Sequence, residues 1–283
     1  MKPVGLGAYL VTILLSLLIS APHGGNIRWA EFDCLVLYLH GIRILHKVVG
    51  ITLSMADFKL DGPRRKPANG AKATSLAVLL HGVGSDGNDL IGLVPHWANL
   101  LPGTEFVSPH GPYPYDMAPQ GRQWFSIHDV SPEVMFAGIT ESALILEEFL
   151  QGELVRTGIT PDRLVLVGFS QGTMMSLHTA LCGEVLLGGI LGYSGRMVLD
   201  PSGPVAIKSR PPTMLIHGDS DELVPVASML EAVEELSSND ILAQWHICRG
   251  LGHSIDQQGL AIGGRFLRDC LSCLLYTSDA ADE

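Results

Sequence analysis

A serine that could act as a nucleophile, Ser170, stands in the middle of the sequence G-F-S-Q-G at residues 168–172. An apolar run at residues 164–167 precedes it, and residues 173–181 have the composition of a helix. Strand, G-x-S-x-G and helix in this order predict a nucleophile elbow, a sharp turn that exposes the serine hydroxyl at a helix N-terminus. Backbone N–H groups at that position can stabilise negative charge. The alternative is a glycine-rich turn that contains a serine by chance.

A serine hydroxyl is a weak nucleophile at neutral pH, so it needs a general base, and the base needs a third group to hold its tautomer. On sheets of this kind the acid and then the histidine follow the serine along the chain. His253 fits this order, because it lies on a glycine-flanked loop just past a predicted strand that ends at Cys248. Packing, strand or helix positions explain the other candidates better: His178, His217 and His246.

The third group is expected among the acidic residues of segment 217–225, which follows an apolar run at residues 214–216. Ligand-binding and catalytic groups gather at this end of parallel strands. Asp219 and Asp221 both fit, and Glu222 fits less well. One of the aspartates could instead form a turn through its side chain. Spacing alone does not separate these two residues.

An acyl-transfer site also needs two hydrogen-bond donors where the carbonyl oxygen gains negative charge. The loop L-L-H-G-V-G at residues 79–84 follows the first strong strand and can supply one backbone N–H. The N–H of Gln171, directly after the serine, can supply the other. The alternative for Gly82 and Gly84 is an ordinary strand-to-helix turn.

The elements that must position these groups alternate between short apolar strands and longer amphipathic segments. This pattern predicts the α/β class, with a mostly parallel central sheet and helices on both faces. Strands are predicted at residues 76–80, 105–108, 164–167, 186–193, 213–217 and 242–248. Helices are predicted at residues 88–101, 132–156, 171–181, 226–237 and 255–271. Residues 109–132, rich in proline and aromatic side chains, predict a loop that walls a binding site.

The two ends of the chain differ from its middle. We interpret residues 1–54 as upstream DNA read in frame, with Met55 as the true start. A signal or anchor is the alternative, since residues 10–20 are apolar. Residues 273–283 look like a translated sequencing adapter, and a disordered acidic tail is the alternative. One folded domain is therefore predicted at residues 55–272.

The composition excludes several classes of partner. The 283 residues are 47% apolar and carry a net charge of −11, with no basic cluster beyond residues 64–66, so nucleic acid is not an expected partner. The early apolar run is too short to predict a membrane span, and a membrane is expected only if residues 1–54 are natural. Cys270 and Cys273 lack a second Cys/His pair, so free thiols in the cytoplasm and no metal site are expected. Export is the alternative if residues 10–20 act as a signal.

Between about Met55 and Ser272 the chain resembles the phospholipase/carboxylesterase family of α/β-hydrolases, which includes the acyl-protein thioesterases. Six ordered motifs are together far more specific than any one of them alone. They are L-H-G-V-G-S-D-G-N-D (80–89), R-Q-W-F (122–125), G-F-S-Q-G (168–172), Y-S-G-R (193–196), H-G-D-S-D-E-L-V-P (217–225) and G-H (252–253).

The resemblance implies roles that spacing left open. It assigns the acid to Asp221, the oxyanion donors to the N–H groups of Val83 and Gln171, and a place near the acyl pocket to Trp124. It also implies that no metal or organic cofactor is needed, and a homodimer is a further expectation because dimers are common in the family.

The predicted function is a serine carboxylesterase that cleaves small-molecule or lipid-like esters through Ser170, His253 and Asp221. The first alternative is a thioesterase or lysophospholipase that acts on long acyl chains attached to protein or lipid. The second is a non-catalytic hydrolase-fold binding protein. Such proteins usually lose a member of the triad, whereas all three positions are filled here.

Overall fold

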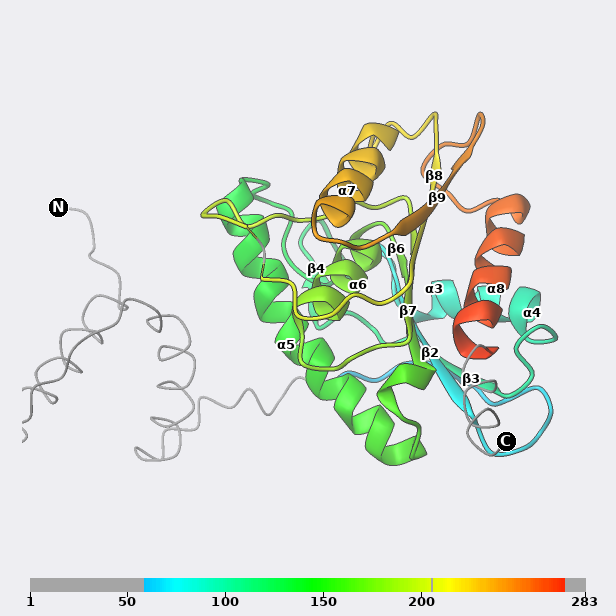
Figure 1. Ribbon diagram of the computed structural model, residues 1–283. Coiled ribbons are helices and arrows are strands. Elements are labelled where there is room, and N and C mark those ends of the chain that lie inside the picture. Colours follow the sequence, from blue (N-terminus) through cyan, green and yellow to red (C-terminus); the bar gives the residue numbers. More distant parts are fainter. Residues whose placement is uncertain (1–58, 205, 273–283) are drawn as a thin grey trace, which may run out of the picture. The chain divides into compact units, whose positions relative to one another are not determined.

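The computed structural model describes residues 59–204 and 206–272 (Figure 1). The predictions for residues 1–54 and 273–283 concern segments that lie outside the described residues.

A seven-stranded sheet forms the centre of the described domain, with the spatial order β1-β3-β2-β6-β7-β8-β9. All neighbours pair in parallel except the short edge strand β1, which runs antiparallel to β3. The strands are β1 (Arg64–Arg65), β2 (Ser75–Leu80), β3 (Thr104–Val107), β6 (Leu164–Phe169), β7 (Gly189–Tyr193), β8 (Thr213–Gly218) and β9 (Ala243–Cys248). The predicted mostly parallel sheet is therefore confirmed.

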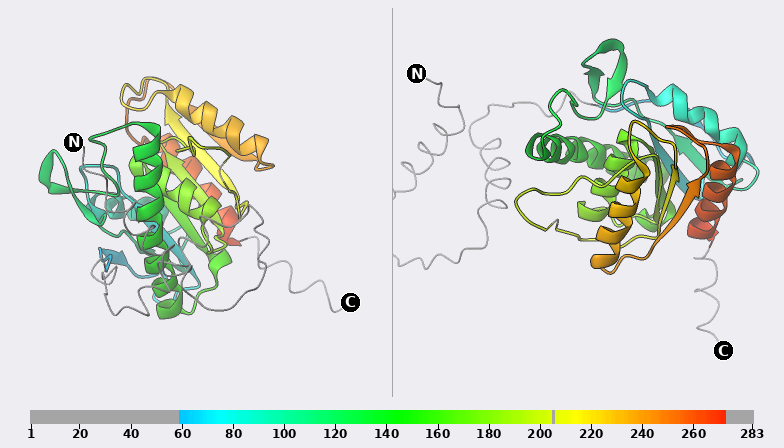
Figure 2. Two further views of the ribbon diagram at one scale, coloured as in Figure 1. Left: turned by 90° about the vertical axis from the view of Figure 1, so that its left-hand side faces the viewer. Right: turned by 90° about the horizontal axis from the view of Figure 1, so that it is seen from above.

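Helices cover both faces of the sheet, as seen from above in Figure 2. One face carries α5 (Pro132–Thr157), α6 (Gln171–Cys182) and α7 (Val226–Ser238), and the other carries α3 (Gly87–Leu90), α4 (Val94–Trp97) and α8 (Gln257–Ser272). Alternate strand residues point to opposite faces. In β2, for example, Leu76 and Val78 join the core under α5 and α6, whereas Ala77 and Leu79 join the core under α8. This explains why the central strands are apolar throughout.

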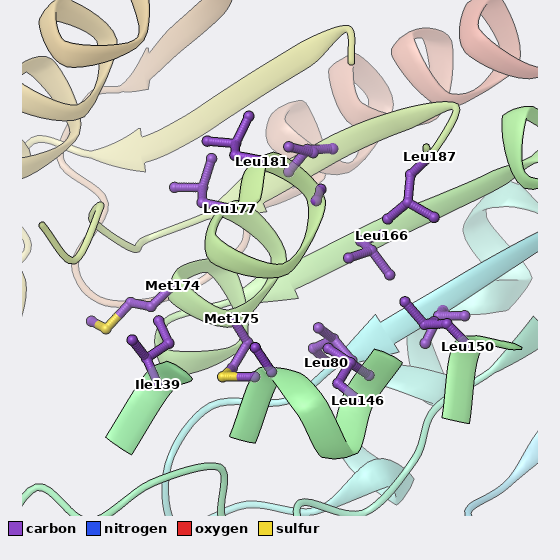
Figure 3. Packing of buried hydrophobic residues seen from close by; sticks show 14 of the residues in the cluster. Leu80, Ile139, Leu146, Leu150, Leu166, Met174, Met175, Leu177, Leu181 and Leu187 are labelled. Carbon is purple, nitrogen blue, oxygen red and sulfur yellow. The ribbon is translucent and has the colours of Figure 1, made fainter. Parts of the chain in front are cut away.

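Helix α5 packs across α6, and α6 leads directly away from the predicted nucleophile. Pro132 lies in the first turn of α5, and Gly158 ends the helix with a φ of 72°, a conformation that glycine adopts without strain. Leu146 of α5 and Met175 of α6 both belong to the buried cluster shown in Figure 3. Because every described residue of α6 before Cys182 is buried, the helix start is held firmly in place.

Two predicted elements differ from the structure. The predicted helix at residues 88–101 is divided into α3, a 3-10 turn (Ile91–Leu93) and α4. Pro95 explains the division, since proline lacks an N–H and its ring restricts the residue before it. The predicted strand at residues 186–193 begins only at Gly189, where its pairing with Val165 starts.

The stretch 109–132 was predicted as a loop, but it contains a two-stranded antiparallel hairpin. Its strands are β4 (Tyr113–Tyr115) and β5 (Ala118–Gln123), with an irregular register between Pro114 and Tyr115. The four prolines between residues 109 and 119 masked the strand pattern, because proline has no N–H to donate to the hydrogen bonds between strands.

Candidate active site

Ser170 occupies the turn between β6 and α6 in a strained backbone conformation. Its φ of 54° and ψ of −117° lie outside the regions that L-residues normally adopt, and its N–H donates to the Tyr193 carbonyl at 2.9 Å. The flanking glycines permit the turn. A Cβ at Gly172 would lie 1.8 Å from the Leu80 carbonyl oxygen, and one at Gly168 would lie 2.4 Å from Gly172 backbone atoms. Ser170 therefore stands at the start of α6 on the turn that the motif predicts.

Asp221 and His253 meet at the carboxyl ends of β8 and β9. The His253 Nδ1 atom lies 2.7 Å from Asp221 Oδ2. A carboxylate only accepts hydrogen bonds, so Nδ1 carries the proton and Nε2 is left free to act as a base. The Asp221 side chain is fully buried, whereas His253 retains some exposure. This arrangement orients the imidazole ring.

Three donors determine the ionisation of Asp221. Burial by itself raises the pKa of the Asp221 carboxyl, but hydrogen bonds from the Val224 N–H, His253 and the Leu223 N–H outweigh it and lower the pKa below its ordinary value. Both backbone N–H groups donate to Oδ1 at 2.9 Å. Asp221 is therefore held as an anion beside His253.

Asp219 has a different environment from Asp221. Its Oδ1 accepts the Gly250 N–H at 2.6 Å and the Ser220 hydroxyl at 3.0 Å. It thus closes the turn after β9 through its side chain, the structural role that the sequence allowed for one of the two aspartates. Glu222, the weaker candidate, is exposed.

The loop that carries His253 is held from β7 as well as from β8. Ser194, at the end of β7, takes a φ of 48°, and its hydroxyl lies 3.3 Å from the Ser254 carbonyl oxygen. The ring of Phe169 lies 4.9 Å from the His253 ring, measured between centroids. Sequence analysis assigned no role to Ser194, although it lies within the matched motif Y-S-G-R.

The loop after β2, which carries Val83, is fixed by the buried His81. Its Nε2 accepts the Gly111 N–H at 2.8 Å, so its proton lies on Nδ1 and is directed at the Gly82 carbonyl, also at 2.8 Å. Burial lowers the pKa of His81, which keeps this ring neutral at neutral pH. The loop conformation before Val83 is therefore set by side-chain hydrogen bonding.

Gln171 contributes more than the backbone N–H that was predicted for it. Its side-chain Oε1 accepts the Trp124 N–H at 2.8 Å, and its Nε2 donates to the Phe125 carbonyl at 2.8 Å. The residue after the predicted nucleophile thus holds the Q-W-F segment against the start of α6. Sequence reasoning missed this function, because the partners lie almost fifty positions away.

Trp124 is fully buried and its indole N–H donates to the His81 carbonyl at 3.0 Å. The indole ring also packs against the His81 ring, with centroids 5.5 Å apart. Trp124 therefore supports the loop 81–84 through this hydrogen bond and this ring contact. Its predicted place near the acyl pocket stays a prediction.

The β4–β5 hairpin lies against the same loop, where the sequence predicted a wall. The Gly84 N–H donates to the Arg122 carbonyl and the Arg122 N–H donates to the Ser85 carbonyl, each at 2.8 Å. The Arg122 guanidinium binds the carbonyls of Gly111 and Pro112.

Within residues 59–204 and 206–272, no group of three or more His, Cys, Asp or Glu side chains is placed to hold a metal ion.

His178 on α6 is a buried imidazole outside this constellation, and it makes stability depend on pH. Burial lowers its pKa from 6.5 to about 4, and its Nδ1 has no hydrogen-bond partner among the described residues. The unfolded chain binds a proton near pH 6.5, whereas the folded protein resists it. Stability is therefore complete above pH 6.5 and falls as the pH drops toward 4.

We expect His178→Leu to remove this part of the acid sensitivity. Between pH 7 and pH 4 the variant should lose about 3 kcal/mol less unfolding free energy than the parent protein. Denaturant unfolding at several pH values measures the difference. Parallel stability curves for the two proteins would contradict the assignment.

Known proteins resemble this chain over most of the described domain. A family model described as phospholipase/carboxylesterase matches residues 67–271. Acyl-protein thioesterase 1 of Gibberella zeae is 30% identical over 212 residues, covering 69% of this chain and 90% of that protein. Esterase YpfH of Escherichia coli is 29% identical over 197 residues, covering 69% and 83%.

Solved structures agree as well. The crystal structure of esterase PE8 has a TM-score of 0.71 and 41% identity, and the match covers 75% of this chain and all of that one. Acyl-protein thioesterase 2 of Zea mays has the same fold, with a TM-score of 0.60 at 21% identity and coverage of 74% and 98%.

Proposed function

Because this chain belongs to the phospholipase/carboxylesterase family, we propose that it is a serine carboxylesterase that works through a Ser170-His253-Asp221 triad. The chain is an α/β-hydrolase of the esterase and acyl-protein thioesterase type. The observation that carries the finer proposal is the 2.7 Å contact between His253 Nδ1 and Asp221 Oδ2 on the same sheet edge as the strained Ser170.

The proposed reaction proceeds in two steps. The Ser170 hydroxyl oxygen attacks the ester carbonyl carbon while His253 Nε2 takes its proton, and the backbone N–H groups of Val83 and Gln171 stabilise the oxyanion. The C–O bond to the alcohol then breaks, and His253 returns the proton to the leaving oxygen. Water, deprotonated by His253, attacks the acyl carbon. The bond from this carbon to the Ser170 oxygen then breaks, and His253 returns the proton to Ser170 as the carboxylic acid leaves. The residues alone supply this chemistry, without a metal or cofactor.

Asp221 supports both steps from the far side of the imidazole. Its lowered pKa keeps it anionic, so it stabilises the imidazolium that forms when His253 takes the serine proton. The hydrogen bonds to Oδ1 hold the carboxylate in place, so Oδ2 remains available for the histidine.

The substrate class is proposed from the names of two relatives. One is called an esterase and the other an acyl-protein thioesterase. The esterase structure at 41% identity favours carboxylic esters as substrates, with long-chain thioesters or lysophospholipids as the second candidate.

None of the helices described between residues 59 and 272 has the length and unbroken apolar character needed to cross a bilayer.

The proposed cellular setting rests on the thiols. Cys182 and Cys248 are free cysteines, and burial raises the pKa of each of these two thiols to about 11. Unpaired, unreactive thiols support a reducing compartment, and we propose the cytoplasm.

A serine-directed fluorophosphonate combined with a substrate panel tests the proposal. We expect the probe to label one site, and peptide mass spectrometry should assign the label to Ser170. The panel comprises p-nitrophenyl esters from C2 to C16 and a palmitoyl thioester, compared by kcat/KM. Preference for short esters supports the carboxylesterase, and preference for C16 or the thioester supports the second candidate. No labelling and no turnover would support a non-catalytic binding protein instead.

A further inference from the structure

His217 places a second imidazole beside the proposed catalytic acid. It is the penultimate residue of β8 and is buried, and its Nε2 lies 2.8 Å from the Val224 carbonyl oxygen and 3.2 Å from Asp221 Oδ2. The Val224 carbonyl only accepts hydrogen bonds, so the proton lies on Nε2 and is donated to that carbonyl, while the Asp221 carboxylate lies beside the same Nε2 atom. The sequence predicted only a packing role for this residue.

Packing alone does not explain an imidazole at this position. The Nδ1 atom of His217 is buried and has no hydrogen-bond partner among the described residues. An unpartnered buried polar atom destabilises a fold. An apolar side chain of similar size would avoid this penalty. The imidazole therefore contributes to the structure through its Nε2–H, which donates to the Val224 carbonyl.

The Nε2–H of His217 links the rigid sheet to the acid loop. Asp221 Oδ1 accepts from the N–H groups of Leu223 and Val224, which belong to the same loop as Asp221 itself. Oδ2 accepts from His253, which lies on another loop. Among the described N–H groups that lie against this carboxylate, only that of His217 comes from a strand of the central sheet.

The same N–H also fixes the loop that holds Oδ1. His217 donates to the carbonyl of Val224, and the Val224 N–H donates to the carboxylate. Loss of the His217 donor therefore frees the Val224 carbonyl and weakens one of the backbone supports of the carboxylate.

We propose that His217 is a positioning residue that holds the Asp221 carboxylate with Oδ2 directed at His253. The inference rests on the proposed triad and deepens it. His217 takes no proton from the substrate, and it acts only through Asp221.

The matched variants His217→Met and His217→Gln test the inference, because the two side chains are similar in length and only glutamine has an N–H donor. We expect His217→Met to lower kcat by about 10- to 100-fold with KM nearly unchanged, since a small misplacement of a catalytic group has effects of this size. His217→Gln should recover most of that loss. His178→Leu is the control, because it removes a buried imidazole that makes no contact with Asp221.

Proton NMR gives a readout that general destabilisation would not move. The His253 Nδ1–H bound to Asp221 should give a strongly downfield resonance in the parent protein and in the Gln variant, and this resonance should shift or broaden in the Met variant. Thermal unfolding is measured in parallel, so that loss of fold is separated from loss of position.

Equal kcat and equal resonances in folded Met and Gln variants would overturn the inference. If the Met variant does not fold, the Gln variant decides, because a folded Gln variant that lacks the resonance or loses about 10- to 100-fold in kcat contradicts the inference. Failure of the triad itself is recognised separately, since the parent protein would then not be labelled at Ser170 by a fluorophosphonate.

Discussion

Ser170→Ala is expected to lower kcat for a p-nitrophenyl ester by about 10⁴-fold or more. The substitution removes the oxygen that forms the acyl-enzyme and leaves the base and the oxyanion donors in place. The variant should also lose labelling by the fluorophosphonate. Because alanine and serine share the same backbone restrictions, we expect the strained turn before α6 and the fold to remain.

Ser176→Ala provides the matched control for this experiment. Ser176 is a buried serine on α6, the helix that follows Ser170, and its hydroxyl donates to the Gly172 carbonyl at 2.8 Å. We expect this variant to retain turnover within a few-fold and to be labelled like the parent protein. Labelling of the Ser170→Ala variant would show that another residue is the nucleophile.

The second large effect is expected from Asp221→Asn, which should lower kcat by about 10³- to 10⁴-fold, because the acid of a Ser-His-Asp triad holds the histidine in the tautomer that accepts the serine proton. An asparagine amide can donate to His253 Nδ1, which favours the tautomer with its proton on Nε2. That tautomer cannot accept the Ser170 proton. Circular dichroism and thermal unfolding establish that the variant is folded before the rate constants are compared.

Asp219→Asn is the control that separates the two aspartates. Its carboxylate accepts the Gly250 N–H at 2.6 Å, and an amide oxygen can accept the same bond. We therefore expect a change in kcat of no more than a few-fold. If Asp219→Asn is crippling and Asp221→Asn is mild, the assignment of the acid is wrong.

The fold was largely predictable because its signals are local. Short apolar runs bounded by glycine and proline mark β2, β6 and β8, and the helical spacing after Pro132 marks α5. The failure at residues 88–101 also has a local cause, since Pro95 divides an amphipathic pattern that otherwise looks continuous.

The hairpin in residues 109–132 was not predictable in the same way. Its second strand begins with Ala118-Pro119-Gln120-Gly121, which has no alternation of apolar and polar residues. Hydrogen bonds between Arg122 and the loop at Gly84–Ser85 hold β5 in place. The hairpin is therefore defined by tertiary contacts rather than by strand propensity.

The sequence by itself determined the residue types and their chain order: a serine on a glycine-flanked turn, then two aspartates, then a histidine on a loop. Those features depend on neighbouring residues, and so a local pattern can carry them. Spacing left the two aspartates open, and only the tertiary structure places Asp221 against His253 and Asp219 at the turn near Gly250. Only the tertiary structure, too, brings the Gln171 side chain to Trp124 and the His217 ring to Asp221. The physical reason is that each of these hydrogen bonds depends on distances and angles set by the folded backbone, and most join residues about thirty to fifty positions apart. Even the short link from His217 to Asp221 depends on how the loop returns to the end of β8.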